Sequence, residues 1–260
     1  MAVDSKLLLR MLTPEIDKAF KEIKGDYGEE SLQRVEDMVT ATPQDRHPLQ
    51  QGAKWIMPGI SRRPWHDPYE HAELEPVARA FEANHTSIKR ELAEAWAARS
   101  AQFMNYEHYL STQEDWQALY LFRSGRPVPD SATLAPTAFD ILDRYVIQPG
   151  KLCTLLESHF SVLLPGATIK PHCDLWNFSI NLHLAVDVPA GCGIRVAGES
   201  REWVEGRCLL FDYSFEHEAW NTGERPRTCL LVDLWHPDTT IPERKALTVL
   251  ITEIRRVLGE

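Results

Sequence analysis

The sequence IKPHCD at residues 169–174 opens the region around which the rest of the chain is organised, and this region extends to His236. Many of the segments in and before this region are short and either apolar or alternating in polarity. They predict strands at residues 116–122, 160–164, 180–186, 194–197, 207–211 and 229–234. Many short strands joined by tight turns are typical of a β-sandwich or jelly roll rather than of a parallel α/β sheet. We therefore predict an α+β fold with a mainly β core.

Three potential metal ligands lie in this region. Alternate side chains of a strand point to the same face, so His172 and Asp174 are expected to point the same way. The leading candidate for a third ligand is His217, at the far end of the run that starts at residue 207. Two imidazoles and one carboxylate form the 2-His-1-carboxylate set that binds Fe(II) and leaves coordination positions open. The pattern indicates an iron oxygenase, although His172 and Asp174 could instead be turn residues before Asn177.

An arginine stands at the start of the last predicted strand. Arg227 follows His217 by ten residues and precedes the apolar run at residues 228–234. A guanidinium buried without a partner is costly, and it can hold a carboxylate in a bidentate fashion. We therefore expect Arg227 to bind a dicarboxylate cosubstrate. The alternative is an ion pair with Asp212 or Asp233.

Composition limits the classes of partner. The chain has 260 residues, of which 43% are hydrophobic and 25% charged, as is usual for a globular protein. Its net charge is −10, and it has no run rich in lysine and arginine, so a nucleic-acid partner is not expected. The sequence gives no indication of an oligomeric state.

Cysteine usage and hydropathy suggest a compartment. The five cysteines are odd in number and form no C-x-x-C pair, so free thiols are expected rather than disulfides or a zinc knuckle. The apolar residues 7–12 are too few for a signal peptide, and Arg10 interrupts them. No run approaches the ~20 apolar residues that span a bilayer. We expect a cytoplasmic protein without a membrane partner.

Helical patterns flank the predicted strands. Thr13 and Pro14 have the residue types of an N-cap and a first helical position. Helices are expected at residues 13–24, 29–40, 73–99, 135–145 and 242–258.

The order of these elements suggests how the chain is organised. We expect one folded unit with an N-terminal helical region at 1–100, a catalytic core at 101–240 and a C-terminal helix at 241–260. Residues 41–70 form a long irregular connection that could either line a pocket or be a solvated loop.

Several motifs resemble the aspartyl/asparaginyl β-hydroxylase family. They are PH at 171–172, LHL at 182–184, SFEHE at 214–218 and VDLWHP at 232–237. The likeness covers about residues 57–240, and the last two motifs are a specific combination. The family consists of Fe(II)- and 2-oxoglutarate-dependent oxygenases with a double-stranded β-helix, or cupin-like, core. The resemblance therefore implies this jelly-roll fold and these two cofactors.

The resemblance also implies roles for individual residues. His172 and His217 match the two iron-binding histidines of the family. Arg227, His183 and Ser161 fall where the family binds the carboxylates of the cosubstrate. A guanidinium and a hydroxyl are suitable donors for a carboxylate.

This chain departs from the family at three positions. The animal protein-modifying members carry glycine where this chain has Asp174, and a second acid where it has Tyr213. The arginine that the family has two residues before His183 is Asn181 here. A cationic group is thereby removed from the site.

Our expectation is a hydroxylase that acts, with molecular oxygen, on an unactivated C–H bond of a small molecule such as an amino acid or a secondary metabolite. Decarboxylation of 2-oxoglutarate to succinate would accompany the reaction. The alternatives are β-hydroxylation of Asp or Asn residues in a polypeptide, a non-catalytic cupin-like ligand-binding module, and a structural barrel that holds zinc.

Overall fold

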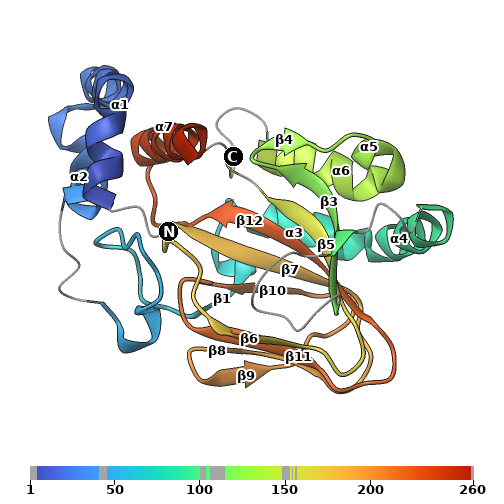
Figure 1. Cartoon of the computed structure of the whole chain (residues 1–260). Coiled ribbons are helices and arrows are strands. Elements are labelled where there is room, and N and C mark those ends of the chain that lie inside the picture. Colours follow the sequence, from blue (N-terminus) through green and yellow to red (C-terminus); the bar gives the residue numbers. More distant parts are fainter. Residues whose placement is uncertain are drawn as a thin grey trace.

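The computed structural model describes residues 5–40, 46–99, 104–105, 115–147, 153, 155 and 157–258, and the structural statements below concern these residues. Two antiparallel sheets face each other, and helices cover the outer face of the larger sheet (Figure 1). The predicted jelly-roll, or cupin-like, core with flanking helices and an N-terminal helical region is confirmed.

The larger sheet forms the centre of the molecule. In spatial order its strands are β1 (Trp65–His66), β10 (Cys208–Phe211), β7 (Ser179–Asp187), β12 (Arg227–Trp235), β5 (Ser158–Leu163), β3 (Trp116–Arg123) and β2 (Met104–Asn105), and β4 (Arg126–Pro127) pairs with β3. All of these strand pairs are antiparallel.

The smaller sheet covers one face of the larger one. Its strands, in spatial order, are β6 (Thr168–His172), β11 (His217–Asn221), β8 (Cys192–Val196) and β9 (Glu199–Arg201). Apolar side chains from both sheets, such as Ile194 and Ala185, form one buried cluster between the sheets.

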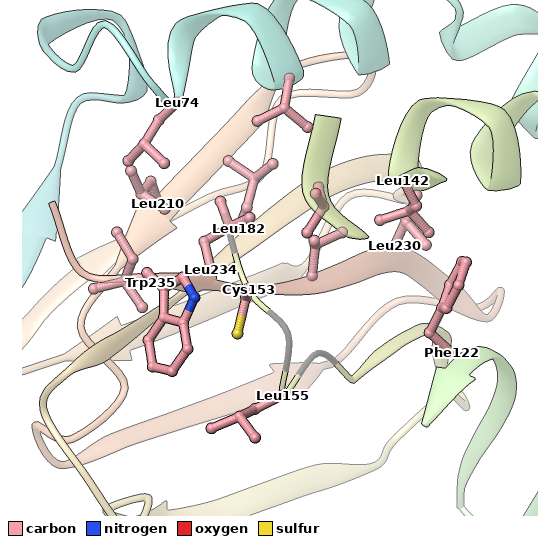
Figure 2. Close-up of a cluster of buried hydrophobic side chains, with 14 of the residues drawn as sticks. Leu74, Phe122, Leu142, Cys153, Leu155, Leu182, Leu210, Leu230, Leu234 and Trp235 are labelled. Atoms are coloured by element: carbon pink, nitrogen blue, oxygen red, sulfur yellow. The ribbon is translucent and has the colours of Figure 1, made fainter. Parts of the chain in front are cut away.

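The period-two pattern of the central strands divides their side chains between two layers. On β12, Leu230, Val232 and Leu234 belong to the cluster under the helices, whereas Cys229 belongs to the cluster between the sheets. Figure 2 shows leucines of β7 and β12 together with Leu74 and Leu142 of the helical side. The face of β12 that points away from the helices is thus free to form a site.

Helices lie on the outer face of the larger sheet and at its side (Figure 1). The α-helices are α1 (Ser5–Tyr27), α2 (Gln33–Thr40), α3 (Glu75–Ala83), α4 (His85–Arg99), α5 (Ser131–Leu134), α6 (Pro136–Leu142) and α7 (Ile241–Leu258). Short 3-10 turns cover Glu29–Leu32, Pro48–Gln50 and Pro68–Glu70, and a π-helical turn covers Asp143–Ile147. Within the described ranges, no helix is both long enough and apolar enough to span a membrane.

Two helix predictions were wrong in their limits. The first helix begins at Ser5 rather than Thr13, so Pro14 is an interior residue. Pro14 lacks the backbone N–H that an interior helical residue donates. An N-cap residue type at Thr13 favours a helix start there but does not prevent the helix from beginning earlier. The helix predicted at 73–99 is divided at Asn84, whose side-chain amide donates to the carbonyl oxygen of Ala80 at 2.8 Å and caps α3.

The described part of the long connection, residues 46–70, packs against the core. The backbone N–H of Glu216 donates to Leu49 O at 2.6 Å, and the Asn177 side chain exchanges two hydrogen bonds with the backbone of Met57. The connection therefore supports the segments next to His217 and Asp174, while residues 41–45 lie outside the described residues.

Two buried histidines meet beside the larger sheet. His66 on β1 and His236 after β12 are 5% and 0% exposed, and their ring centroids are 5.1 Å apart. Burial lowers the pKa of His66 to about 4 and that of His236 to about 3, and neighbouring imidazoles lower both pKa values further. Both rings are therefore uncharged in the folded protein near neutral pH.

Acid is expected to destabilise the fold through these rings. An unfolded histidine has a pKa of about 6.5, so at lower pH the unfolded chain binds more protons than the folded one. The contribution of each histidine to the free energy of unfolding is fully present above about pH 6.5. Below that pH, the free energy of unfolding falls by about 1.4 kcal/mol per pH unit for each of the two histidines. Urea denaturation at pH 7.5 and pH 5.0 measures the loss, which should be smaller in His66→Gln. If His66→Gln and the wild type lost equal amounts of unfolding free energy between pH 7.5 and pH 5.0, His66 would not be a source of the acid sensitivity.

Candidate functional site

The three predicted metal ligands meet at the edge of the smaller sheet. His172 ends β6 and His217 begins β11, and the two residues are direct partners in the ladder between these strands, with ring centroids 4.0 Å apart. Asp174 follows β6, where its backbone N–H donates to Tyr213 O at 2.9 Å. The Oδ2 atom of Asp174 lies 3.7 Å from Nε2 of His217. One potential ligand atom from each residue lies within 4.8 Å of the others.

Hydrogen bonds orient the two imidazoles in the same way. Nδ1 of His172 lies 2.7 Å from Lys170 O, and Nδ1 of His217 lies 2.9 Å from Phe215 O. A carbonyl oxygen can only accept, so in each ring Nδ1 carries the proton and Nε2 keeps its lone pair. This arrangement fixes metal-binding histidines in many proteins.

Electrostatics at the trio also suit a cation. Burial, and then the neighbouring His172, lower the pKa of His217 to about 3, so its ring is neutral. Burial and the Glu157 carboxylate raise the pKa of Asp174, although 45% of the Asp174 side chain is exposed. Two imidazoles and a carboxyl group that pairs with no lysine or arginine among the described residues match the donors that a divalent transition metal binds.

A turn carries the chain from one sheet to the other before His217. The sequence predicted a strand at residues 207–211 and placed His217 at the far end of that run, and β10 does end at Phe211, in the larger sheet. The carboxylate of Asp212 accepts hydrogen bonds from the backbone N–H and the hydroxyl of Ser214, at 2.9 and 2.6 Å. This turn lets His217 start a strand of the smaller sheet, where it becomes the partner of His172.

A cavity of about 150 Å³ lies between the sheets beside the trio. All six site residues named from the sequence line it, and they are His172, Asp174, His217, Arg227, His183 and Ser161. The larger sheet contributes the last three of these from β12, β7 and β5, and the smaller sheet contributes the two histidines.

Arg227 is buried at the start of β12. It is 1% exposed, its Nη1 donates a long hydrogen bond of 3.4 Å to Ser161 O, and its Nε has no hydrogen-bond partner. Its guanidinium lies 4.6 Å from the ring centroid of Trp203. Within the described part of the chain no carboxylate forms an ion pair with it, and the pairings with Asp212 or Asp233 are not found. A guanidinium buried without a counter-charge is costly, and an anionic ligand would offset that cost.

Ser161 and His183 leave polar groups for a ligand. The Oγ of Ser161 accepts from Nε1 of Trp116 at 2.8 Å, so its own proton is available to another acceptor. His183 is 7% exposed, its Nδ1 has no hydrogen-bond partner, and its ring is stacked 6.1 Å from Trp203. Burial first, and then Arg227, lower the pKa of His183, so its ring is neutral.

The structure adds cavity residues that the sequence did not indicate. His159, Asn181 and Asp233 point into the cavity from the strands of the larger sheet, and Trp203 stacks on His183 from the segment before β10. Period-two alternation within the predicted strands could have identified Asn181 and Asp233, whereas His159 lies one residue before the strand predicted at residues 160–164. Trp203 lies outside any strand, and nothing in the sequence predicted its place.

Comparison with known proteins identifies related sequences. A sequence model of the family described as Aspartyl/Asparaginyl beta-hydroxylase matches residues 82–237. The chain is 31% identical over 193 residues to "Aspartyl/asparaginyl beta-hydroxylase" of Mus musculus, which covers 74% of this chain and 26% of that protein. It is 38% identical over 142 residues to human "Aspartate beta-hydroxylase domain-containing protein 2", covering 51% of this chain and 37% of that protein.

These matches concern only part of each relative, because the chain spans about a quarter of the length of the mouse protein. Among solved structures, a Pseudomonas putida prolyl-4-hydroxylase is 16% identical, with a TM-score of 0.40 over 58% of this chain and 87% of that chain.

Proposed function

The chain belongs to the aspartyl/asparaginyl β-hydroxylase family, and from this premise we propose that it is an Fe(II)- and 2-oxoglutarate-dependent hydroxylase. The observation that carries the proposal is the shared orientation of His172 and His217, each with Nδ1 bound to a carbonyl oxygen two residues earlier. Both Nε2 atoms are thereby left as metal donors beside the carboxylate of Asp174. Three protein ligands from such a set leave positions for cosubstrate and oxygen.

The residues around the trio have separate tasks in this proposal. Iron held there would supply the oxidising chemistry, with 2-oxoglutarate and oxygen as co-reactants. Arg227 would grip the distal carboxylate of 2-oxoglutarate, because it is a buried guanidinium with a free Nε. The hydroxyl of Ser161 and the neutral ring of His183 would complete its polar contacts. The apolar cluster between the sheets would keep water from the reacting atoms.

Trp203 is expected to support Arg227 in this role. Replacing it with leucine removes the aromatic face 4.6 Å from the guanidinium. Cation–π contacts contribute about 0.5–2 kcal/mol, so the KM for 2-oxoglutarate should rise about 2- to 30-fold. The content of bound iron should not change, since Trp203 is not among the potential ligands. Steady-state kinetics and metal analysis of Trp203→Leu test the two statements separately. An unchanged KM would contradict the role of Trp203 beside Arg227, and a loss of iron would show that the substitution disturbs the metal site.

The names of the relatives bear on the substrate. They support aspartyl or asparaginyl β-hydroxylation, the alternative drawn from the sequence, better than they support a small molecule. The aspartyl or asparaginyl group is therefore the first substrate class to examine. A small molecule is the second candidate, because the carboxylate of Asp233 also lines the cavity and favours a cationic ligand there.

A direct test uses anaerobically purified protein loaded with Fe(II). The protein is given 2-oxoglutarate and air together with either an aspartyl- and asparaginyl-containing peptide or a panel of free amino acids. We expect succinate in proportion to a product that gains the mass of one oxygen, measured by mass spectrometry. Omitting iron should stop both.

Two results would contradict the proposal. Protein that binds zinc in preference to iron and does not bind 2-oxoglutarate would indicate a structural barrel. Protein that binds iron and 2-oxoglutarate but forms no succinate with any member of the panel would indicate a ligand-binding module.

A further inference from the structure

Asp233 and Asn181 form a polar pair on the cavity wall away from Arg227. They are direct partners in the ladder between β12 and β7, and both line the same cavity as the metal-ligand trio. Asp233 lies six residues beyond Arg227 on β12, and at about 3.3 Å per residue this corresponds to roughly 20 Å of strand. Arg227 and Asp233 have odd positions on the same strand and so share the face that points into the cavity.

Asn181 offers an acceptor that nothing in the described part of the protein uses. The residue is 9% exposed, and its Nδ2 donates to Oδ1 of Asp233 at 2.8 Å. This hydrogen bond fixes which side of the amide is the oxygen. The Oδ1 atom of Asn181 is buried and has no hydrogen-bond partner. Buried acceptors are almost always satisfied, so a donor from a bound molecule is the natural partner.

Asp233 is a carboxylate without a counter-charge. Its two oxygens accept from Asn181 Nδ2 and from the backbone N–H of Glu157, at 2.8 and 3.2 Å. Among the residues that the structure describes, no lysine, arginine or histidine forms an ion pair with it. Burial, and then the Glu157 carboxylate, raise the pKa of Asp233 to about 7, as expected for a carboxyl group that lacks a nearby cation.

We propose that Asp233 and Asn181 bind a positively charged nitrogen, an ammonium or a guanidinium, of the substrate. The atoms presented by this pair are acceptors, and such a nitrogen has only donors to offer. An aspartyl side chain would instead bring a second carboxylate toward Asp233, and like charges repel. Within the proposed function, this pair favours the second candidate substrate class, a free amino acid or another amine, over an aspartyl side chain of a polypeptide. The term substrate rests on the proposed hydroxylase function.

The test compares molecules that carry a cationic nitrogen, the charged forms, with acetylated forms of the same molecules that lack one. Iron-loaded protein with 2-oxoglutarate is kept anaerobic and titrated with the twenty free L-amino acids and with an N-acetylated tripeptide amide that contains aspartate. The acetylated forms are made for all amino acids except arginine and histidine, whose side chains can stay cationic, and both amino groups of lysine are acetylated. Ligand-observed NMR reports the affinities. A charged hydrogen bond contributes enough that loss of the cation should weaken binding by about 10- to 100-fold. Two outcomes overturn the proposal. In the first, the acetylated forms or the tripeptide bind as tightly as the charged forms. In the second, no charged form binds at about 10 mM, a concentration well above the Kd of a weak complex of about 1 mM.

Variants locate the effect at this pair. Asp233→Asn should weaken binding of the charged forms about 10-fold or more, and Asn181→Arg should abolish it by placing a guanidinium opposite Asp233. Asp140→Asn removes the same charge from α6 and is the matched control, which should bind as the wild type does. The comparison of acetylated and free amino acids uses only wild-type protein, so the proposal stays testable even if a variant does not fold.

The same preparations distinguish the two levels of the argument. Thermal shift with 2-oxoglutarate and metal analysis report whether the proposed hydroxylase site exists. If iron and 2-oxoglutarate bind while charged and acetylated amino acids bind equally, only the cation-binding inference fails. If neither iron nor 2-oxoglutarate binds, the proposed function fails first.

Discussion

Replacing Asp174 with alanine is expected to weaken iron binding by more than about 100-fold and to reduce succinate formation to a similar extent. Mutation of residues that merely hold a metal ligand already costs about 10- to 100-fold, so loss of a ligand itself should cost more. The prediction follows from two features of the site. The Asp174 carboxylate lies 3.7 Å from Nε2 of His217, and Asp174 supplies the one carboxylate among the three potential ligands that the structure describes.

Metal titration under anaerobic conditions measures the first effect, and succinate quantified by NMR measures the second. Glu216→Ala is the matched control, because it removes an exposed carboxylate next to His217 in sequence. That variant should bind iron as the wild type does. Full activity of Asp174→Ala would show that two histidines are sufficient and would remove Asp174 from the ligand set.

The local part of this site could be predicted from the sequence. Strand periodicity was the reason to group His172 with Asp174. In the structure β6 ends at His172, and Asp174 reaches the trio from the segment after the strand, where its backbone N–H donates to Tyr213 O. The strands themselves were indicated by period-two patterns and turn residues. Their number and shortness indicated a sandwich or jelly roll, and the family resemblance implied the jelly roll. These signals are local, and each one depends on a few neighbouring residues.

The partner of His172 required information that local patterns do not contain. His217 was named as a candidate, but it was assigned to the end of the run from residue 207, which lies in the other sheet. The turn held by Asp212 and Ser214 carries the chain across, and only the ladder between β6 and β11 brings His217 opposite His172. Strand pairing between distant segments depends on the whole topology.

The same limit applies to Asp233. Its place on β12 was visible in the sequence, and pairing with Arg227 was one of the alternatives. In the structure, the direct partner of Asp233 is Asn181 on β7, and Arg227 lies six residues away on the same strand. The opposite charges thus occupy separate parts of the cavity. This separation is consistent with the two proposals, a dicarboxylate bound at Arg227 and a cation bound at Asp233.

Replacing Arg227 with methionine is expected to raise the KM for 2-oxoglutarate by about 100- to 4,000-fold. Removal of one partner of a buried ion pair costs about 3–5 kcal/mol, and about 1.4 kcal/mol corresponds to a factor of ten. Methionine is similarly long and apolar, so it should fill much of the same space against Trp203. Substrate saturation curves for 2-oxoglutarate measure the change.

The melting temperature of Arg227→Met should not fall, although its KM for 2-oxoglutarate rises. This contrast separates a role of Arg227 in binding from a role in the fold. In the protein without cosubstrate, Arg227 is 1% exposed with no ion-pair partner among the described residues, so its removal should leave the melting temperature unchanged or higher. Addition of 2-oxoglutarate should raise the melting temperature of the wild type and not that of Arg227→Met. Arg225→Met is the matched control, since Arg225 is largely exposed and pairs with Asp187. A large fall in the melting temperature of Arg227→Met with an unchanged KM would assign the arginine to the fold instead of to the cosubstrate.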